Sequence, residues 1–262
     1  MRIFSKRIFS LFAGKPAFQR FLVFLQRLAL VGMGIGSGAD CDTSGELQVL
    51  RYAKGRLMGA PIIFDVGAHI GNYTKLVQQT FLGAATVHAF EPSNETYNRL
   101  QHNLTGAENV LLHNAALGDQ PGTSELYSEA PASRLGSLYH RRLDHFGREL
   151  SQRESVRVDT IDDFCRRNRI KCIDFLKLDV EGNELKCLKG ATRMVTENRV
   201  RFIQFEFGGA DIDSRTFFQD FWYLLSPKYR LYRILPGGLY EVDRYTEELE
   251  VFLTTNYLAE LK

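Results

Sequence analysis

Two carboxylates and a glycine loop between them are the residues of this chain whose types and spacing could bind a small molecule. Asp65 stands just before Gly67 and Gly71, where an apolar run gives way to a helical pattern, and Glu91 ends the next apolar run. The glycines let the backbone turn and approach a ligand closely, and a helix that begins near Asn72 offers unpaired amide donors. Asp65 would repel a pyrophosphate but attract an ammonium or sulfonium group.

The form of the loop separates two classes of cofactor. A nicotinamide dinucleotide requires G-x-G-x-x-G, with its pyrophosphate over the helix end, whereas this loop is G-x-x-x-G. Glu91 could accept hydrogen bonds from both hydroxyls of a ribose, and Pro92 beside it suits the start of a helix. The pair Asp65 and Glu91 therefore favours S-adenosylmethionine, and a nucleotide-binding (NAD-type) oxidoreductase is the alternative.

The segments that must position these residues alternate between short apolar runs and helical patterns from Pro61 onward. That alternation predicts βαβ units, and runs this apolar suit a largely parallel sheet that is covered on both faces. The predicted strands are residues 62–66, 86–90, 110–114, 175–180 and 202–207. The predicted helices are residues 72–81, 93–104, 160–167 and 183–189.

Two later segments depart from this alternation. Residues 229–235, 239–242 and 249–255, with a turn at Pro236-Gly237-Gly238, are typical of antiparallel strands at a sheet edge. Residues 118–158 form a stretch with several Gly and Pro that is too long for a simple loop. We interpret it as an insertion over the strand ends, where open α/β sheets bind ligands.

The first forty residues differ in charge from the rest, because six basic residues and no acidic one precede Asp40. An apolar stripe recurs there at helical spacing and comprises Phe18, Phe21, Leu22, Leu25 and Leu28. Arg20 and Arg27 lie off the centre of this stripe. They interrupt the apolar segment from Met1 to Val31, so the ~20 consecutive apolar residues of a bilayer span are missing. We expect a helix packed on the main domain, with a helix on an anionic membrane surface as the alternative.

A glycine-rich stretch at residues 32–38 is interpreted as a flexible joint. The predicted organisation is therefore a basic, amphipathic helical extension with its linker over residues 1–58, followed by the main domain over residues 59–262.

Composition excludes several classes of protein. The chain has 33 Lys plus Arg and 31 Asp plus Glu, so its net charge of +2 gives no sign of a nucleic-acid partner. A hydrophobic fraction of 44% predicts a globular core. Four cysteines without a C-x-x-C pair lack the pattern of a zinc site, and no metal site is predicted. Without a cleavage site of A-x-A form, the protein is expected in the cytoplasm, at the membrane periphery if the helix docks there.

The order and spacing of five segments resemble the FkbM-type S-adenosylmethionine-dependent methyltransferases. The matching segments are Asp65-Val-Gly-Ala-His-Ile-Gly71, Phe90-Glu91-Pro92, Asn114-Ala115-Ala116-Leu117, Val158-Asp-Thr-Ile-Asp-Asp-Phe164 and Leu176-Lys-Leu-Asp-Val-Glu-Gly182. The family usually has Asn where this chain has His69. The resemblance implies a doubly wound α/β fold, the Rossmann-like class I methyltransferase, with a mostly parallel seven-stranded sheet. It also implies O-methylation of a sugar, a glycan or a secondary metabolite.

The resemblance further implies where the cofactor lies. Its ribose would contact Glu91 and Pro92, its adenine would lie at Asn114 and Ala115, and Asp179 would also contact it. The methionine part would be flanked by the loop residues Gly67, Ala68, His69, Gly71 and Asn72.

Methyl transfer to a hydroxyl needs an aligned acceptor and a group that takes its proton. Alignment can supply ~7–11 kcal/mol, whereas a general base contributes about 10²–10⁴-fold, so the pocket matters more than the base. Candidates for the base are Asp179, Glu181 and Glu206, with His69 as a fourth. A divalent metal held by these carboxylates is a weaker alternative.

The insertion carries polar residues that suit a polyhydroxylated acceptor, and Arg134, Ser137 and Tyr139 are the predicted substrate contacts. The expected partner is therefore a small molecule or a glycan and not a nucleic acid. A third hypothesis is a catalytically inactive, cofactor-binding module that docks on a membrane or on a partner through the N-terminal helix.

Overall fold

The computed structural model describes residues 13–36 and 44–262. Part of the predicted glycine joint, from Ser37 to Gly38, lies outside the described residues, as do Arg2, Lys6 and Arg7 of the basic extension. The division at residue 58 stays a prediction.

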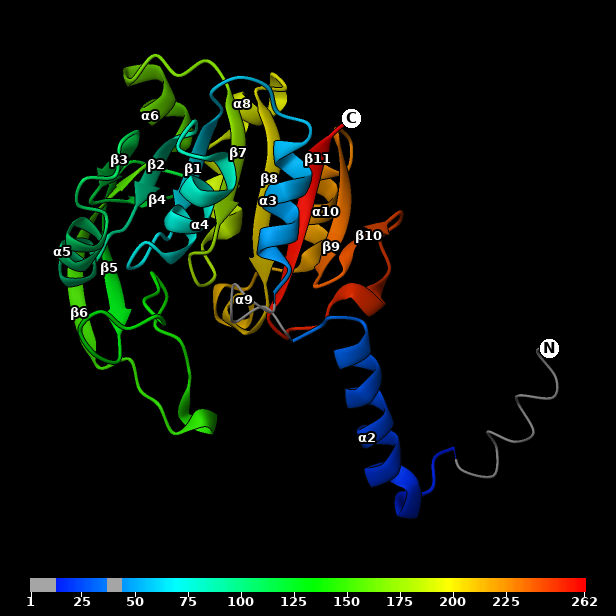
Figure 1. Ribbon diagram of the computed structural model, residues 1–262. Helices are drawn as coiled ribbons and strands as arrows, with labels where there is room; N and C mark the ends of the chain where they lie inside the picture. Colours follow the sequence, from blue (N-terminus) through cyan, green and yellow to red (C-terminus); the bar gives the residue numbers. More distant parts are fainter. Residues whose placement is uncertain (1–12, 37–43) are drawn as a thin grey trace.

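A central sheet of eight strands organises the main body of the molecule (Figure 1). Its order is β10-β9-β11-β8-β7-β1-β2-β3. The parallel strands are β1 (Ile62–Val66), β2 (Thr86–Phe90), β3 (Val110–His113), β7 (Ile173–Leu178) and β8 (Val200–Phe207). The antiparallel edge is formed by β11 (Thr255–Leu261), β9 (Tyr229–Leu235) and β10 (Gly238–Val242). The predicted doubly wound, mostly parallel sheet with an antiparallel C-terminal edge is thus confirmed.

Two details of that edge differ from the prediction. The sheet has eight strands and not seven, because β10 folds back on β9 in a hairpin at Pro236-Gly237. The strand expected at 249–255 is wrong, since that segment holds the short helix η2 (Glu247–Leu249) and β11 begins only at Thr255. β11 lies between β8 and β9, where both of its faces are covered, and its central residues Tyr257, Leu258 and Ala259 are all buried.

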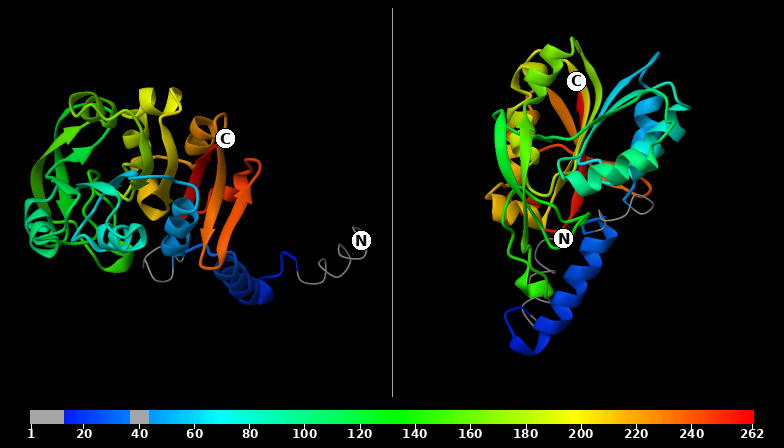
Figure 2. Two further views of the ribbon diagram at one scale, coloured as in Figure 1. Left: turned by 45° about the horizontal axis from the view of Figure 1, so that its top comes forward. Right: turned by 90° about the vertical axis from the view of Figure 1, so that its left-hand side faces the viewer.

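Helices cover both faces of the sheet (Figures 1 and 2). One face packs against α3 (Glu46–Lys54) and α4 (Asn72–Phe81), with α5 (Asn94–Asn103) beyond them. The other packs against α6 (Ile161–Arg167), α7 (Glu184–Lys189), α8 (Thr192–Thr196) and α10 (Phe218–Leu225). Successive residues alternate between the two cores: Ile63 belongs to the first and Phe64 to the second, and both are fully buried. This two-sided burial explains why the strands read as continuous apolar runs.

The segment interpreted as an insertion contains a second, three-stranded sheet of order β4-β6-β5. Its strands are β4 (Ala116–Leu117), β5 (Gly122–Ser128) and β6 (Gln152–Asp159), and β5 pairs antiparallel with β6. The connection between β5 and β6 carries the short helix η1 (Asp144–Phe146). We call residues 129–151 the insertion loop.

The helix α2 (Pro16–Gly32) contradicts the expectation of a helix packed on the main domain, because none of its residues is buried. It extends away from the sheet (Figures 1 and 2). Only the residues that follow it reach the body: Ile35 is buried, and the amide of Gly36 donates to the Thr254 carbonyl at 3.1 Å. No helix in the described part of the chain is long and apolar enough to cross a membrane.

Candidate active site

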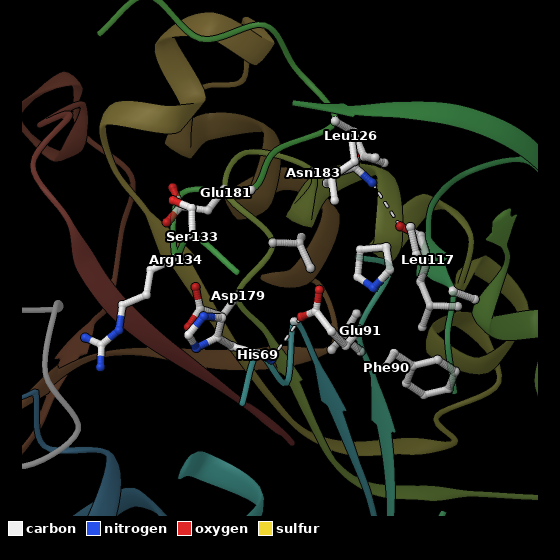
Figure 3. Close-up of a pocket in the computed structure, with 18 residues that line it drawn as sticks. His69, Phe90, Glu91, Leu117, Leu126, Ser133, Arg134, Asp179, Glu181 and Asn183 are labelled. Carbon is white, nitrogen blue, oxygen red and sulfur yellow. Dashed lines mark hydrogen bonds between the residues drawn. The ribbon is translucent and has the colours of Figure 1, made fainter. Parts of the chain in front are cut away.

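The candidate site lies at the carboxyl ends of β1, β2 and β7. The chain order reverses between β1 and β7, and ligands of open α/β sheets bind at such a switch point. Two adjoining cavities open there. The inner pocket is lined by the ends of the three strands and by the insertion loop (Figure 3). The outer groove, about 1260 Å³ in volume, continues from it over Asp179 and Glu181 toward residues 252–254.

The glycine loop after β1 is fixed between the ends of β2 and β7. The amides of Gly67 and Ala68 both donate to the Phe90 carbonyl, at 3.0 and 2.9 Å. Gly67 has a φ of +83°, and a Cβ there would lie 1.8 Å from the Asp179 carbonyl oxygen. Only glycine can therefore bring the two strand ends this close.

Like Gly67, His69 lines both cavities. Its φ is +49°, in the left-handed region where Asn, Asp and His are enriched among the other residues. The Asn that the family usually has would suit the same conformation. The imidazole Nε2 lies 3.2 Å from the Ala132 carbonyl of the insertion loop, and burial lowers the pKa of the ring.

Glu91 is placed as a cofactor ligand would be. Its side chain lines the inner pocket, and its two oxygens accept hydrogen bonds from the amides of His69 and Ser93, each at 3.0 Å. Burial raises the pKa of Glu91 to about 7, although these two amides counteract the effect. A carboxylate oxygen has two lone pairs, so each oxygen can still accept a hydroxyl from the pocket.

Asp65 lies behind the loop and lines neither cavity. It is fully buried, accepts a hydrogen bond of 2.6 Å from the Thr74 hydroxyl of α4, and lies 3.8 Å from the Lys177 amino group. Burial raises the pKa of Asp65. Its charge therefore acts on the site through Lys177, which is also 2.9 Å from Asp179.

Lys177 joins the two carboxylates. Burial lowers the pKa of its amino group, but the carboxylates of Asp179 and Asp65 outweigh burial and raise it overall. The lysine stays charged, so it neutralises part of the negative charge at the end of β1 and β7. Asp179 itself lines both cavities.

Glu181 and Glu206 complete the acidic wall of the outer groove. Glu181 has a φ of +53° and forms an ion pair with Arg141, whose guanidinium also lies 3.8 Å from Asp213. Burial raises the pKa of Glu181 despite the arginine. Within the described residues, the Glu206 carboxylate makes no hydrogen bond or ion pair. Burial, followed by the nearby charges of Asp179 and Glu181, raises its pKa well above the ordinary range.

The other predicted ligand residues divide into three groups. Ala115 and Pro92 line the inner pocket, while Ala68 and Asn72 line the outer groove. Gly71 and Asn114 line neither. The Asn114 side chain donates to the carbonyls of Glu91 and Pro92, both at 3.0 Å, and so fixes the chain after β2.

The predicted substrate contacts also separate. Arg134 lines both cavities. Ser137 is fully buried and donates to the Glu181 carbonyl at 2.7 Å, and Tyr139 lies under the Lys186 amino group, so both support the insertion loop. No cluster of three or more His, Cys, Asp or Glu that could hold a metal occurs in residues 13–36 and 44–262.

Sequence reasoning missed several residues that line the cavities. Leu126 and Leu138 close the apolar side of the inner pocket. Phe146 and residues 252–254 border the outer groove. The apolar ones carry no chemical signal in the sequence, because only the fold shows that they lie at the strand ends.

Comparisons with known proteins agree with the resemblance seen in the sequence. A family model, the methyltransferase FkbM domain, matches residues 65–234. The hexuronic acid methyltransferase AglP of Haloferax volcanii is 27% identical over 154 residues, which are 58% of this chain and 58% of that protein. Methyltransferase 1 of Beauveria bassiana is 28% identical over 145 residues, 49% of this chain and 57% of that protein. The chain thus spans less than two thirds of the length of these relatives.

The chain is also similar to solved structures, among them the human methyltransferase 10 domain containing protein. The TM-score with that structure is 0.46 and the sequence identity is 10%, and the match covers 83% of this chain and 82% of that chain. A SAM-dependent O-methyltransferase of Thermotoga maritima gives a TM-score of 0.43 and 13% identity, over 83% of this chain and 65% of that one. The family model covers well over half of the sequence. The chain therefore belongs to the FkbM methyltransferase family.

Proposed function

We infer that the chain is an S-adenosylmethionine-dependent methyltransferase that methylates a hydroxyl of a sugar, a glycan or a secondary metabolite. The observation that carries this proposal is the junction of the two cavities at Asp179. A pocket with a carboxylate suited to ribose opens there into a large polar groove with an unpaired carboxylate, Glu206. One cavity would hold the methyl donor and the other the acceptor.

The inner pocket fits the donor by the chemistry of its lining. Glu91 would accept hydrogen bonds from the ribose hydroxyls, and Asp179 would attract the ammonium group of the methionine part. The apolar side of the pocket, formed by Phe90, Leu117 and Leu126, would cover the adenine. When bound, the cofactor would supply a sulfonium methyl group for transfer to the acceptor oxygen, with the thioether S-adenosylhomocysteine as the leaving group.

Glu206 is the best-placed group to take the acceptor's proton. Of the three predicted bases, Asp179 is bonded to Lys177 and Glu181 to Arg141, so each already has a cationic partner. Glu206 has none within the described residues, and burial raises its pKa, which makes its carboxylate a stronger proton acceptor. Asp179 and Glu181 would instead bind and orient the donor and acceptor.

The acceptor class is supported by the groove and by one relative. The groove walls carry several polar side chains, Asn72, Lys75, Gln79, Arg134 and Arg148, which suit an acceptor with many hydroxyls or a carboxylate. AglP, the relative from Haloferax volcanii, is named for a hexuronic acid. A sugar acid is therefore the first acceptor to test.

Calorimetric titration with S-adenosylhomocysteine tests the donor half of the proposal, with NAD as the comparison ligand. We expect S-adenosylhomocysteine to bind and NAD not to bind. Failure of a folded protein to bind S-adenosylhomocysteine would reject the proposal, and binding of NAD instead would favour an oxidoreductase.

Transfer is tested with methyl-labelled S-adenosylmethionine and a panel of sugar acids, neutral glycans and hydroxylated metabolites. Label in the acceptor that withstands mild base indicates an ether, as O-methylation of a hydroxyl requires. If the label is released by mild base, the product is an ester and the acceptor group is a carboxylate. Cofactor binding without transfer to any acceptor class would favour an inactive binding module.

A further inference from the structure

The helix α2 presents an uncovered apolar face of the kind that globular proteins normally bury. Phe21, Phe24, Leu28 and Val31 are 58%, 60%, 59% and 72% exposed, and no residue of the helix is buried. At the helical angle of 100° per residue these four side chains lie within an arc of about 80°, and Arg20 and Arg27 border that arc beside Val31. The helix therefore has an apolar face flanked by two arginines, and no other described residue of the chain buries that face.

The charge of α2 points to the kind of surface that covers it. The helix holds Arg20 and Arg27 and no acidic residue, and Lys15 precedes it. A helix with an apolar face of Phe and Leu that is bordered by arginines lies in the interface of an anionic bilayer, with its apolar side chains below the headgroups and the guanidinium groups at headgroup level.

The insertion loop supplies a second element of the same chemistry. Phe146 of η1 is 69% exposed, and the nearby side chains of Arg142 and Arg148 are 85% and 53% exposed. These two arginines form solvent-exposed ion pairs with Asp144 and Glu129, at 3.7 and 3.8 Å. Figure 1 shows η1 and α2 both projecting beyond the sheet toward the same end of the molecule, and the right-hand view of Figure 2 shows the same. Two separate elements thus offer apolar tips and basic side chains on one side of the protein.

The outer groove opens between these two elements. One wall includes Phe146 and Arg148 of the insertion loop. The other includes Leu253 and Thr254, and the Thr254 carbonyl accepts the hydrogen bond from Gly36 that holds the end of α2. A surface contacted by both elements would therefore face the mouth of the groove.

We propose that α2 and the 142–148 segment dock the protein on an anionic phospholipid bilayer, with the outer groove facing the membrane. The acceptor would then be a hydroxyl presented at the bilayer, such as the headgroup or glycan of a lipid. This assignment of the acceptor rests on the proposed methyl transfer, whereas the docking does not.

Vesicle co-sedimentation of the full-length chain tests the docking. Vesicles of phosphatidylcholine with phosphatidylglycerol should retain the protein at low salt and release it as salt rises, because charges are screened over ~8–10 Å at physiological ionic strength. Phosphatidylcholine alone should retain much less. A folded chain that stays in solution with anionic vesicles at low salt overturns the proposal.

Two variants separate the apolar and the basic contributions. Phe21→Ser with Phe24→Ser and Leu28→Ser removes the apolar face, and Arg20→Glu with Arg27→Glu reverses the charge. Each should weaken partition onto anionic vesicles by about tenfold or more. Because all these side chains are exposed, the melting temperature should not change.

A matched control removes equally exposed apolar side chains from the opposite end of the sheet. Met58, Leu82 and Tyr223 are 93%, 83% and 66% exposed, and Met58 and Leu82 lie just before β1 and β2 begin. Replacing all three by Ser should leave vesicle binding unchanged. Equal losses in the control and in the α2 variants would overturn the proposal.

Two further measurements identify the other outcomes. S-adenosylhomocysteine affinity, measured without vesicles, should be the same in the α2 variants and in the wild type, so loss of docking is not confused with loss of the cofactor site. Sedimentation velocity reports the oligomeric state. A dimer that the α2 variants dissociate, together with no vesicle binding, would assign α2 to a second copy of the chain and overturn the proposal.

Discussion

Replacing Glu91 by Gln is the sharpest test of the inner pocket. The carboxylate both accepts hydrogen bonds from backbone amides and presents a charged acceptor to the pocket, and the Gln amide alters the second role more than the first. In the wild type each oxygen accepts one backbone amide, from His69 and from Ser93, and faces the pocket. The Gln side chain keeps one acceptor oxygen, but its NH₂ group meets the other backbone N–H as a second donor. The variant thus loses the charge and one of two acceptors at nearly constant volume.

The size of the effect follows from the hydrogen bonds at stake. A hydrogen bond to a charged group contributes about 1.5–3 kcal/mol, and every 1.4 kcal/mol is about tenfold in affinity. Glu91→Gln should therefore weaken S-adenosylhomocysteine binding by roughly 10- to 150-fold at pH 8. A change of fold should not cause this loss, since the residue at 91 lies at a strand end and not within either main core.

The pH dependence gives an independent signature. Burial raises the pKa of Glu91 to about 7, so the carboxylate that accepts ribose hydroxyls is present above pH 7 and is lost as the pH falls through that value. Wild-type affinity should fall by about tenfold from pH 8 to pH 6, because only about a tenth of Glu91 is ionised one unit below its pKa. The affinity of the Gln variant should be nearly constant over the same range.

Calorimetric titration at several pH values measures both effects, and Glu154→Gln is the matched control. Glu154 also accepts a backbone amide, that of Asn94 at 2.9 Å, but lines neither cavity. Its variant should bind like the wild type. If Glu91→Gln binds as tightly as the wild type at pH 8, or if the two pH profiles run parallel, the ribose is not held by Glu91.

Three further predictions concern stability. Gly67→Ala should destabilise the fold by more than about 2 kcal/mol and abolish cofactor binding, because the alanine Cβ would overlap the Asp179 carbonyl at a positive φ. Gly237→Ala is the control, since a Cβ there has open space, and this variant should melt like the wild type. Glu206→Gln should raise the melting temperature at pH 8 but not at pH 5. The reason is that a buried carboxyl with a raised pKa makes the folded protein less stable as the pH rises. A lower melting temperature of the variant at pH 8 would contradict this. Burial lowers the pKa of His88 and of its neighbour His113 to about 4. The folded protein therefore loses stability as the pH falls from about 6.5 toward 4. His88→Leu should reduce the drop in melting temperature between pH 7 and pH 5.

The sequence predicts the parallel half of the fold well because local and global signals agree there. The strands β1 and β2 and the helix α4 begin and end at the predicted residues. Both of these strands are buried on both faces, and α4 starts beside the glycine loop. At the chain end this agreement fails: residues 249–253 are as apolar as a strand, yet they pack against the end of the sheet while the following residues pair.

The candidate site shows what a sequence cannot give, namely the direction of a side chain at a strand end. Asp65 and Asp179 both belong to recognisable motifs, but Asp65 points toward α4 and Asp179 toward the cavities. Likewise Ser137 and Arg134 lie three residues apart in one loop, and only the arginine reaches the pocket. The difference depends on pairing with residues far along the chain, such as the contact of Ser137 with Glu181.

The acidic groups of the outer groove affect one another's pKa values through their charges. Asp179, Glu181 and Glu206 lie close enough to repel one another. Burial raises the pKa of both Glu181 and Glu206, and the charge of Asp179 adds to the effect. Lys177 offsets the charge of Asp179, and Arg141 that of Glu181. Removing either cation should therefore raise the pKa of Glu206 further, since it would face an additional uncompensated carboxylate. The two cations thus act as positioning residues, and Lys177 in particular lowers the pKa of Glu206, the one carboxylate of the three that has no cationic partner within the described residues.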